Sequence, residues 1–277
     1  MARTKELECV KYEIDDEGIA WVTFNRPEKR NAMNPELHFN MQAVIAELET
    51  DDDAKVLVIT GAGDAWSSGM DLREFFRATD NDPAARFKAQ WAHRHWTQFL
   101  ATSQKATIAM VNGYCFGGAF CSLAACDIVI TAEDATFGLS EVNWGILPGG
   151  NVSKVFADLV NHRNAMFYAM TGRTFDGAKA VEMGIATLAV PADDLRDEVV
   201  SIARELMEKA PMVLAYTKQA MRNVGDMDMN MAYEYLATKG MALRAADPKD
   251  TRGRGMSEFL DKKTYRPGLG PVSLEDE

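Results

Sequence analysis

The chain lacks the features that would direct it to membranes, to export or to nucleic acid. Its 277 residues contain no stretch approaching 18 uninterrupted apolar residues, and its first eight residues are polar and charged. Neither a membrane span nor an export signal is therefore expected. Basic residues are the minority, with 30 Lys and Arg against 41 Asp and Glu and a net charge of −11. This balance disfavours general binding of nucleic acid, and we expect a cytoplasmic protein.

Cysteines are also few. Cys9, Cys115, Cys121 and Cys126 show no Cys-x-x-Cys spacing and have no histidine close to them in the sequence, so they do not form a metal-binding pattern. Free cysteine usually behaves as a small buried hydrophobe. We expect four reduced, buried thiols and no metal site.

What the chain does contain is a glycine-rich turn between an apolar run and a run of small residues. Residues 107–111 fit a buried strand, and the Gly117-Gly118 pair fits a tight turn. A helix over residues 119–125 is expected to open directly from this turn. Backbone N–H groups at a helix start have no partner within the helix, so they can bind an anionic oxygen. The turn predicts half of an oxyanion hole.

A lone carboxylate follows about twenty residues later. Glu141 stands in an otherwise apolar and amide-rich segment, residues 137–148. A carboxyl group in such surroundings is expected to have a raised pKa and to serve as acid and base in turn.

A second glycine-containing loop lies earlier in the chain. Gly61 and Gly63 match the start of a dinucleotide-binding fingerprint, but Trp66 stands where the third glycine is needed for close helix packing. A Rossmann site is therefore disfavoured. We expect instead a loop whose Gly69-Met70 backbone approaches a ligand closely.

Strands and helices alternate in the N-terminal half. Residues 19–24 and 56–60 fit strands, and the helix between them begins after Asn34, a good N-cap, with Pro35 in the first helical position. A crossover of this length allows the two strands to pair in parallel. Asp82 is expected to cap a further helix. The pattern predicts an α/β fold.

The further helix carries the motif His93-Arg94-His95, which invites a metal or catalytic interpretation. Histidines two positions apart point to different faces of a helix. We expect the motif to lie on a solvated face.

From Gly150 onward the sequence predicts mainly helices, which span residues 161–170, 176–183, 193–209, a segment from 211, and 227–243. One short strand is expected at residues 185–190. The last helix is rich in Met and Tyr, a composition typical of an adaptable apolar surface. The acidic tail, residues 267–277, is expected to be loose.

The two glycine-containing loops and Glu141 together resemble the enoyl-CoA hydratase/isomerase, or crotonase, superfamily. The sequence around Trp144 is similar to the hydroxycinnamoyl-CoA hydratase-lyase branch, and the resemblance covers residues 8–265. It implies a crotonase-type ββα spiral core over residues 1–195, with the CoA and catalytic site. It also implies an α-helical region over residues 196–277 that closes the acyl pocket and forms a trimer or a dimer of trimers.

The resemblance assigns roles to individual residues. The N–H groups of Met70 and Gly118 would hold the thioester oxygen, and Glu141 would be the acid and base. The substrate-binding candidates are Lys29, Arg30, Ser68, Phe75, Cys121, Trp144, Gly145 and Tyr235. No permanently bound cofactor is implied, because coenzyme A arrives as part of the substrate. Arg26 and Lys29 fit solvated surface charges equally well.

The implied reaction is hydration of a 4-hydroxycinnamoyl-CoA, such as feruloyl-CoA, followed by retro-aldol cleavage to acetyl-CoA and a vanillin-type aldehyde. A simple hydratase would carry a second glutamate where Cys121 stands. One carboxylate suffices in the hydratase-lyase branch because a 4-hydroxyaryl ring stabilises positive character at the β-carbon. Hydration or isomerisation of another acyl-CoA stays open. An RNA-binding homologue is a further alternative, which the acidic charge disfavours.

The chain departs from that branch at the residues that hold the phenol. In our alignment, tyrosines of the branch stand where this chain has Phe75 and Ala237. Tyr233 and Tyr235 are the nearest replacement donors, and packing in a core or interface is the competing interpretation of both.

Overall fold

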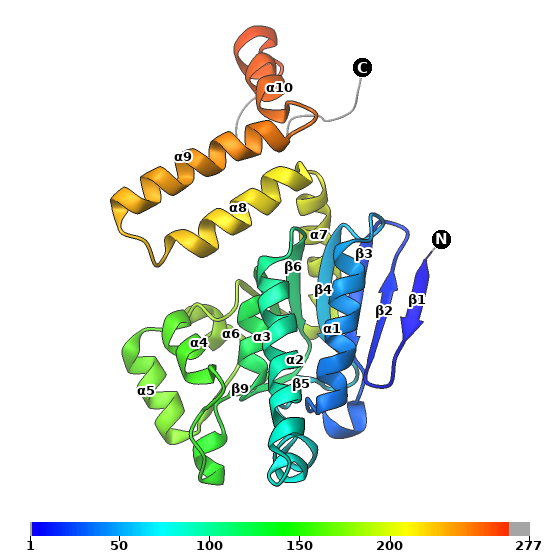
Figure 1. The fold of residues 1–277 in the computed structure, drawn as a ribbon, viewed down its shortest axis with the longest axis vertical. Coiled ribbons are helices and arrows are strands. Elements are labelled where there is room, and N and C mark those ends of the chain that lie inside the picture. The colour runs from blue at the N-terminus through cyan, green and yellow to red at the C-terminus, as the bar shows by residue number, and fades with distance from the viewer. Residues whose placement is uncertain (1, 266–277) are drawn as a thin grey trace. The chain divides into compact units, whose positions relative to one another are not determined.

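The computed structural model describes residues 2–265, which divide into two compact units. The first unit takes the chain up to Ser103 and from Thr107 to Ala203; the second takes Gln104–Ala106 and the chain from Arg204 onward. The predicted loose tail, residues 267–277, lies outside the described residues. The two units are described separately below (Figure 1).

A large mixed sheet forms the centre of the first unit. Its strand order is β1-β2-β3-β4-β6-β8-β11. The strands are β1 (Arg3–Glu6), β2 (Val10–Ile14), β3 (Ile19–Phe24), β4 (Val56–Gly61), β6 (Ala106–Val111), β8 (Ile128–Ala132) and β11 (Leu188–Val190). The first three strands pair antiparallel, and β3 pairs with β4 in parallel, which confirms the predicted strand–helix–strand unit.

A smaller sheet of four short strands carries the functional loops. Its order is β10-β9-β7-β5, from β5 (Ala65–Ser67), β7 (Tyr114–Phe116), β9 (Phe137–Gly138) and β10 (Thr174–Phe175). Strands β5, β7 and β9 are parallel neighbours. Because parallel strands end at the same edge of a sheet, the segments that follow these three strands meet there.

Helices α1 (Pro35–Glu49), α2 (Pro83–Thr102) and α3 (Ala119–Ala125) pack beside the large sheet (Figure 1). The predicted caps of the first two are confirmed: Asn34 accepts a hydrogen bond from Leu37 N–H at 2.8 Å, and Asp82 accepts one from Ala85 N–H at 2.9 Å. The helix expected directly after the Gly117-Gly118 turn is α3.

The rest of the first unit is mainly helical, as predicted. It contains the short turns η1 (Pro27–Lys29), η2 (Leu72–Phe76), η3 (Arg77–Thr79), η4 (Glu141–Trp144) and η5 (Ala192–Asp194), and the helices α4 (Val152–Leu159), α5 (His162–Thr171), α6 (Gly177–Glu182) and α7 (Leu195–Met207). The strand predicted at residues 185–190 is shorter than expected, because only its last three residues pair with β8.

The second unit contains α8 (Pro211–Val224), α9 (Met229–Ala246), α10 (Thr251–Ser257) and η6 (Glu258–Lys262). Helices α8 and α9 pack against each other (Figure 1). Tyr235 on α9 accepts a hydrogen bond from Asn223 Nδ2 at 2.8 Å and donates one to the carbonyl of Gln219 at 3.4 Å. These contacts join the two helices.

Cysteine burial follows the prediction, since all four thiols are free and buried. Within residues 2–265, none of the helices is both long enough and apolar enough to span a membrane.

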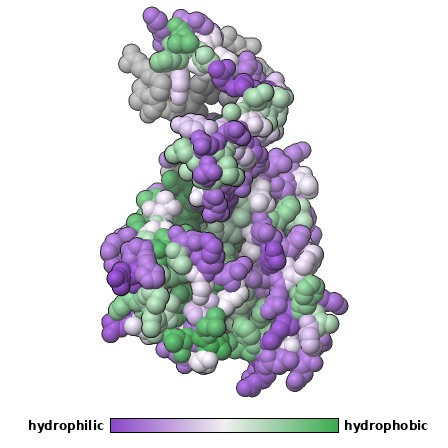
Figure 2. Space-filling view, turned by 60° about the vertical axis from the view of Figure 1, so that its left-hand side comes forward, coloured by the Kyte–Doolittle hydropathy of each residue, from purple (hydrophilic) through white to green (hydrophobic). Residues whose placement is uncertain are grey.

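Figure 2 brings the α4–α5 side of the first unit forward and shows apolar surface, in green, among hydrophilic regions. Large exposed apolar side chains of residues 142–170 are Val142, Trp144, Ile146, Leu147, Met166, Phe167 and Met170. Exposed apolar side chains gathered in one region are typical of an interaction surface.

Candidate active site

Three loops of the first unit meet at one edge of the smaller sheet. Met70 follows β5, the Gly117-Gly118 turn follows β7, and Glu141 follows β9. They line a cavity of about 1810 Å³. This volume exceeds the roughly 300–1,000 Å³ of common small-molecule sites, so the cavity has room for a large ligand.

The first two loops touch through their backbones. Gly69 has a φ of +91°, and a Cβ placed on it would lie 2.6 Å from the carbonyl oxygen of Phe116 and 3.3 Å from the nitrogen of Gly118. Glycine is needed at this position because it lacks the Cβ and tolerates positive φ. A Cβ on Gly118 would lie 2.8 Å from Met70 Cγ. The Met70 and Gly118 peptides therefore lie side by side.

Backbone hydrogen bonds hold Met70 in place without using its own N–H. Met33 N–H donates to the Gly69 carbonyl at 2.8 Å, and Asp71 N–H donates to the Met33 carbonyl at 3.0 Å. Within the described part of the chain, neither Met70 N–H nor Gly118 N–H donates to a protein acceptor. Two adjacent unpaired N–H groups can together stabilise an oxyanion.

Glu141 lies against the glycine turn. Gly117 has a φ of +51°, and a Cβ placed on it would lie 2.9 Å from Glu141 Oε1. The other carboxyl oxygen, Oε2, is buried with no hydrogen-bond partner among the described residues. Burial raises the pKa of Glu141, the direction expected for a carboxyl group in apolar surroundings. A raised pKa brings a carboxyl group closer to neutral pH, which suits it to act as both acid and base.

Cys121 faces the same part of the cavity. Its thiol donates to the carbonyl of Gly150 at 3.5 Å, and burial together with the charge of Glu141 raises its pKa to about 11. The thiol is therefore protonated at neutral pH and is a weak nucleophile.

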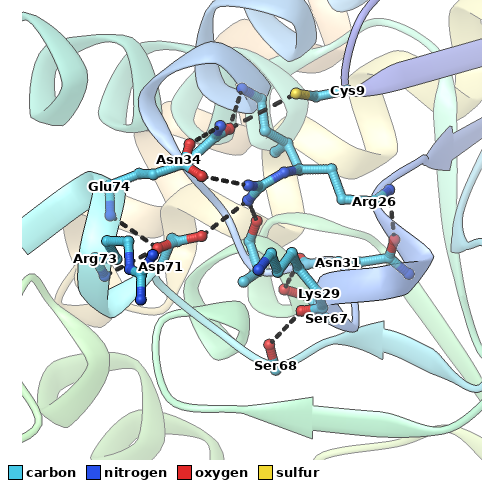
Figure 3. Close-up of polar contacts among 12 residues, drawn as sticks. Cys9, Arg26, Lys29, Asn31, Asn34, Ser67, Ser68, Asp71, Arg73 and Glu74 are labelled. Atoms are coloured by element: carbon cyan, nitrogen blue, oxygen red, sulfur yellow. Dashed lines mark hydrogen bonds and ion pairs between the residues drawn. The ribbon is translucent and has the colours of Figure 1, made fainter.

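Arg26 is not a surface charge, which corrects the sequence-based interpretation. It is buried, and its guanidinium group pairs with Asp71 at 3.1 Å and with Glu74 at 2.9 Å (Figure 3). Asn34 Nδ2 donates to the other oxygen of Glu74 at 2.6 Å. Burial favours the protonated form of Asp71, but hydrogen bonds from Glu74 N–H and Arg26 outweigh it and lower its pKa. This network anchors the residue that follows Met70.

Lys29 and Arg30 are exposed and line the cavity. Arg30 lies over the ring of Tyr114, 4.6 Å from its centroid. Ser68 lines the cavity and donates through its hydroxyl to the Lys29 carbonyl at 3.3 Å. These contacts place two cations beside the loop that carries Met70.

His93 is buried, so the expectation of a solvated His93-Arg94-His95 motif is wrong for its first member. The buried residues of α2 include Ala89, His93, Trp96 and Leu100, which recur every three or four positions and form one stripe. His95 lies off this stripe and is exposed. The physical reason is the packing of α2 against α1, which covers the stripe.

The candidate residues that line the cavity are Lys29, Arg30, Ser68, Met70, Phe75, Gly118, Cys121, Glu141 and Trp144. Gly145 is not among the lining residues of the described chain; it ends η4 with a φ of +72°. Tyr235 belongs to the second unit.

Some lining residues were not assigned to the site from the sequence. His93 was noted as part of a histidine motif but was placed on a solvated face; its spacing from Trp96 and Ala89 was the signal of burial, since three or four positions separate residues on one helix face. Arg94, from the same motif, and Tyr114 also line the cavity, and the sequence analysis assigned neither of them to the site.

The chain is similar to several known proteins. The family model described as enoyl-CoA hydratase/isomerase matches residues 15–266. A hydroxycinnamoyl-CoA hydratase-lyase of Pseudomonas fluorescens is 48% identical over 94% of this chain and 95% of its own length. A probable enoyl-CoA hydratase of Mycobacterium tuberculosis is 31% identical over 90% of this chain and 93% of its own length. The crystal structure of an enoyl-CoA hydratase from Bacillus anthracis superposes with a TM-score of 0.82 and 25% identity, covering 92% of this chain and 97% of that one.

Proposed function

The chain belongs to the enoyl-CoA hydratase/isomerase family, whose crotonase fold it shares, and from this premise we propose that it hydrates and then cleaves a 4-hydroxycinnamoyl-CoA thioester. The products are acetyl-CoA and an aromatic aldehyde of the vanillin type. The similarity to a hydroxycinnamoyl-CoA hydratase-lyase supports this choice of substrate. One observation carries the chemistry: Glu141 lies against the glycine turn, beside the unpaired N–H groups of Met70 and Gly118.

In the first half of the reaction, water adds to the β-carbon and a proton is delivered to the α-carbon. The electron-releasing 4-hydroxyaryl ring stabilises positive character at the β-carbon, so water attacks with little help from a base. Glu141 takes a proton from the water and supplies the proton to the α-carbon. The N–H groups of Met70 and Gly118 stabilise the negative charge that develops on the thioester oxygen.

In the second half, Glu141 takes the proton of the new β-hydroxyl group. The bond between the α- and β-carbons breaks, its electron pair enters the thioester enolate, and the aldehyde leaves. The enolate carbon then takes back the proton held by Glu141 and becomes acetyl-CoA, which restores the Glu141 carboxylate. The same two N–H groups stabilise this enolate, and no permanently bound cofactor is needed because water and the thioester supply every atom.

Lys29, Arg30 and the Ser68 loop are assigned to the CoA part of the substrate, and Phe75, Cys121 and Trp144 to its acyl part. Two exposed cations fit phosphate groups, and a buried ring fits an aryl group. The trimer or dimer of trimers and the cytoplasmic location stay predictions, and the exposed apolar side chains of residues 142–170 support association with other copies of the chain.

One observation favours a second candidate, hydration or isomerisation of a less polar acyl-CoA. Phe75 lines the cavity and has no hydroxyl group to bind a phenol. Mass spectrometry of the products from feruloyl-, coumaroyl-, cinnamoyl- and crotonyl-CoA separates the two candidates. The lyase predicts acetyl-CoA and an aldehyde from the first two thioesters. Hydrated or isomerised products alone, with no aldehyde from any of the four, would refute it.

A further inference from the structure

Three buried side-chain nitrogen or oxygen atoms have no hydrogen-bond partner among residues 2–265: Glu141 Oε2, His38 Nε2 and His93 Nε2. Leaving such an atom unpaired costs free energy, so each of them requires an explanation. The proposed reaction accounts for the Glu141 atom. The two histidines have no part in that reaction.

The two histidines lie next to each other between helices. His38 is on α1 and His93 is on α2, with their ring centroids 4.7 Å apart. Phe75 meets His38 edge to face, with a centroid distance of 5.6 Å. His93 and Phe75 both line the cavity that contains Glu141. The unpaired imidazoles therefore adjoin the wall of the candidate active site.

A neighbouring indole group sets the tautomer of His38. Trp96 Nε1–H is only a donor, and it points to His38 Nδ1 at 3.3 Å. His38 Nδ1 must therefore accept and carry no hydrogen. Burial, and secondarily His93, hold the pKa of His38 well below its usual value, so the ring is neutral. Its single hydrogen is then on Nε2, which is a donor with no acceptor.

His93 is neutral as well, because burial lowers its pKa to about 4. A neutral imidazole carries one N–H donor and one acceptor nitrogen. His93 Nε2 can therefore complement a hydroxyl group in either tautomer, because a hydroxyl both donates and accepts. A carbonyl or an ammonium group could satisfy only one of the two tautomers.

We propose that His93 binds a hydroxyl group on the aryl end of the acyl chain, with His38 as the positioning residue behind it. Phe75 supplies the apolar ring contact for the aryl group, and His93 supplies the polar contact that Phe75 lacks. This proposal rests on the proposed function, because that function is what brings an acyl chain with an aryl group into the cavity. It assigns the recognition of the phenol to the imidazole of His93.

Binding of two thioesters that cannot be hydrated tests this without relying on catalysis. The probes are 3-(4-hydroxyphenyl)propanoyl-CoA and 3-phenylpropanoyl-CoA, which differ only in the hydroxyl group, and the measurement is isothermal titration calorimetry of the full chain. His93→Phe should weaken binding of the hydroxylated probe about tenfold, the equivalent of about 1.4 kcal/mol. Binding of the phenyl probe should change less than about twofold.

His95→Phe is the matched control, because His95 is two positions away on the exposed face of the same helix. It should leave both affinities unchanged. His93→Met, which keeps an adaptable apolar side chain, repeats the test if His93→Phe does not fold, as judged by circular dichroism. Equal losses of affinity for both probes, or no loss for either, would overturn the proposal. His93 would then have a structural role, or its Nε2 would pair with a buried water molecule.

The two proposals can fail separately. If the four-thioester panel shows no aldehyde but His93→Phe still selectively weakens the hydroxylated probe, the lyase function falls and the hydroxyl site stands. If aldehyde forms and both probes respond alike, the lyase function stands and the hydroxyl site falls.

Discussion

Two groups of residues, at the cavity wall and directly behind it, owe their positions to different parts of the fold. The glycine-turn group, Met70, Gly117, Gly118 and Glu141, stands at the edge of the smaller sheet, where three parallel strands end. The imidazole group, His38, Phe75, His93 and Trp96, includes three side chains contributed by the packed helices α1 and α2. The first group supplies backbone donors and the second supplies side-chain nitrogens. Substitution of single side chains can therefore alter the second without disturbing the first.

Burial is the main cause of the pKa shifts in both groups, with opposite signs. It raises the pKa of Glu141 and lowers the pKa of His38 and His93. In each case the neutral form is favoured, as expected for ionisable groups removed from water. A carboxylate whose pKa is raised takes up a proton more readily, whereas a neutral imidazole keeps an acceptor nitrogen. The same physical effect thus suits one group to proton transfer and the other to recognition.

The largest effect is expected from Glu141→Gln, which keeps the shape of the side chain but removes its proton chemistry. Turnover of feruloyl-CoA should fall at least about 100-fold, as for the loss of an acid–base group. The affinity for 3-phenylpropanoyl-CoA, measured by calorimetry, should be retained because the pocket is intact. A variant that keeps more than a tenth of the activity would remove Glu141 from its assigned role.

Gly118→Pro tests the backbone donor of the same group. Proline has no N–H, so turnover should fall by about 100-fold if this donor stabilises the enolate. Gly118→Ala is the comparison variant: it keeps the N–H at a residue with helical φ of −55°, but its Cβ would lie 2.8 Å from Met70 Cγ and the Met70 side chain would have to shift. Its activity therefore measures the effect of the added methyl group without loss of the donor. Circular dichroism must show that both variants fold. A folded proline variant with undiminished activity would contradict the assignment.

Local signals explain which parts of this architecture were predictable. The Asn34 cap, β3 and the helix after the glycine turn follow from neighbouring residues, and all three are confirmed. The smaller sheet was not predicted as a sheet. Its strands have only two or three residues, and they pair with segments far away in the chain. Short strands of this kind carry too little periodicity to be recognised.

The burial and the partners of charged and titratable residues also could not be predicted from their neighbours in the sequence. Arg26 lies among three cations in the sequence, and only the fold brings Asp71 and Glu74 to it. His93 shares a motif with an exposed histidine, and its burial depends on the packing of α1 against α2. Burial of a polar residue needs partners or neighbours from other elements, which the sequence does not place.

A smaller effect is expected from Tyr235→Phe. This variant tests whether a tyrosine hydroxyl binds the phenol of the substrate in addition to the imidazole group. The sequence predicts a decrease in kcat/KM for feruloyl-CoA of about tenfold, or ~1.4 kcal/mol, with little change for cinnamoyl-CoA. Tyr233→Phe, two positions earlier on α9, is the comparison variant. The hydroxyl of Tyr235 already contacts Asn223 and Gln219. Equal responses to the two substrates in both variants would assign these tyrosines to packing within the second unit.

The smallest effect concerns stability and distinguishes a buried His93 from an exposed one. Histidine in an unfolded chain titrates near about 6.5, whereas the pKa of His93 in the folded protein is about 4. Between these values the unfolded chain binds more protons, so the free energy of unfolding decreases as the pH falls from about 6.5 towards about 4. Each additional proton bound by the unfolded chain changes the free energy of unfolding by about 1.4 kcal/mol per pH unit.

Urea unfolding of the wild-type protein and of His93→Phe across this pH range measures the slope. The variant should lose stability less steeply, by nearly one proton, while His38 continues to contribute in both proteins. Carboxylates with lowered pKa, such as Asp71, lose their stabilising effect at still lower pH, and they do so equally in both proteins. The difference between the two slopes therefore reports mainly on His93, with a smaller part from its effect on the pKa of His38. Equal slopes in the two proteins would mean that His93 is protonated as readily in the folded as in the unfolded chain. His93 would then not be the buried neutral imidazole that the proposal requires.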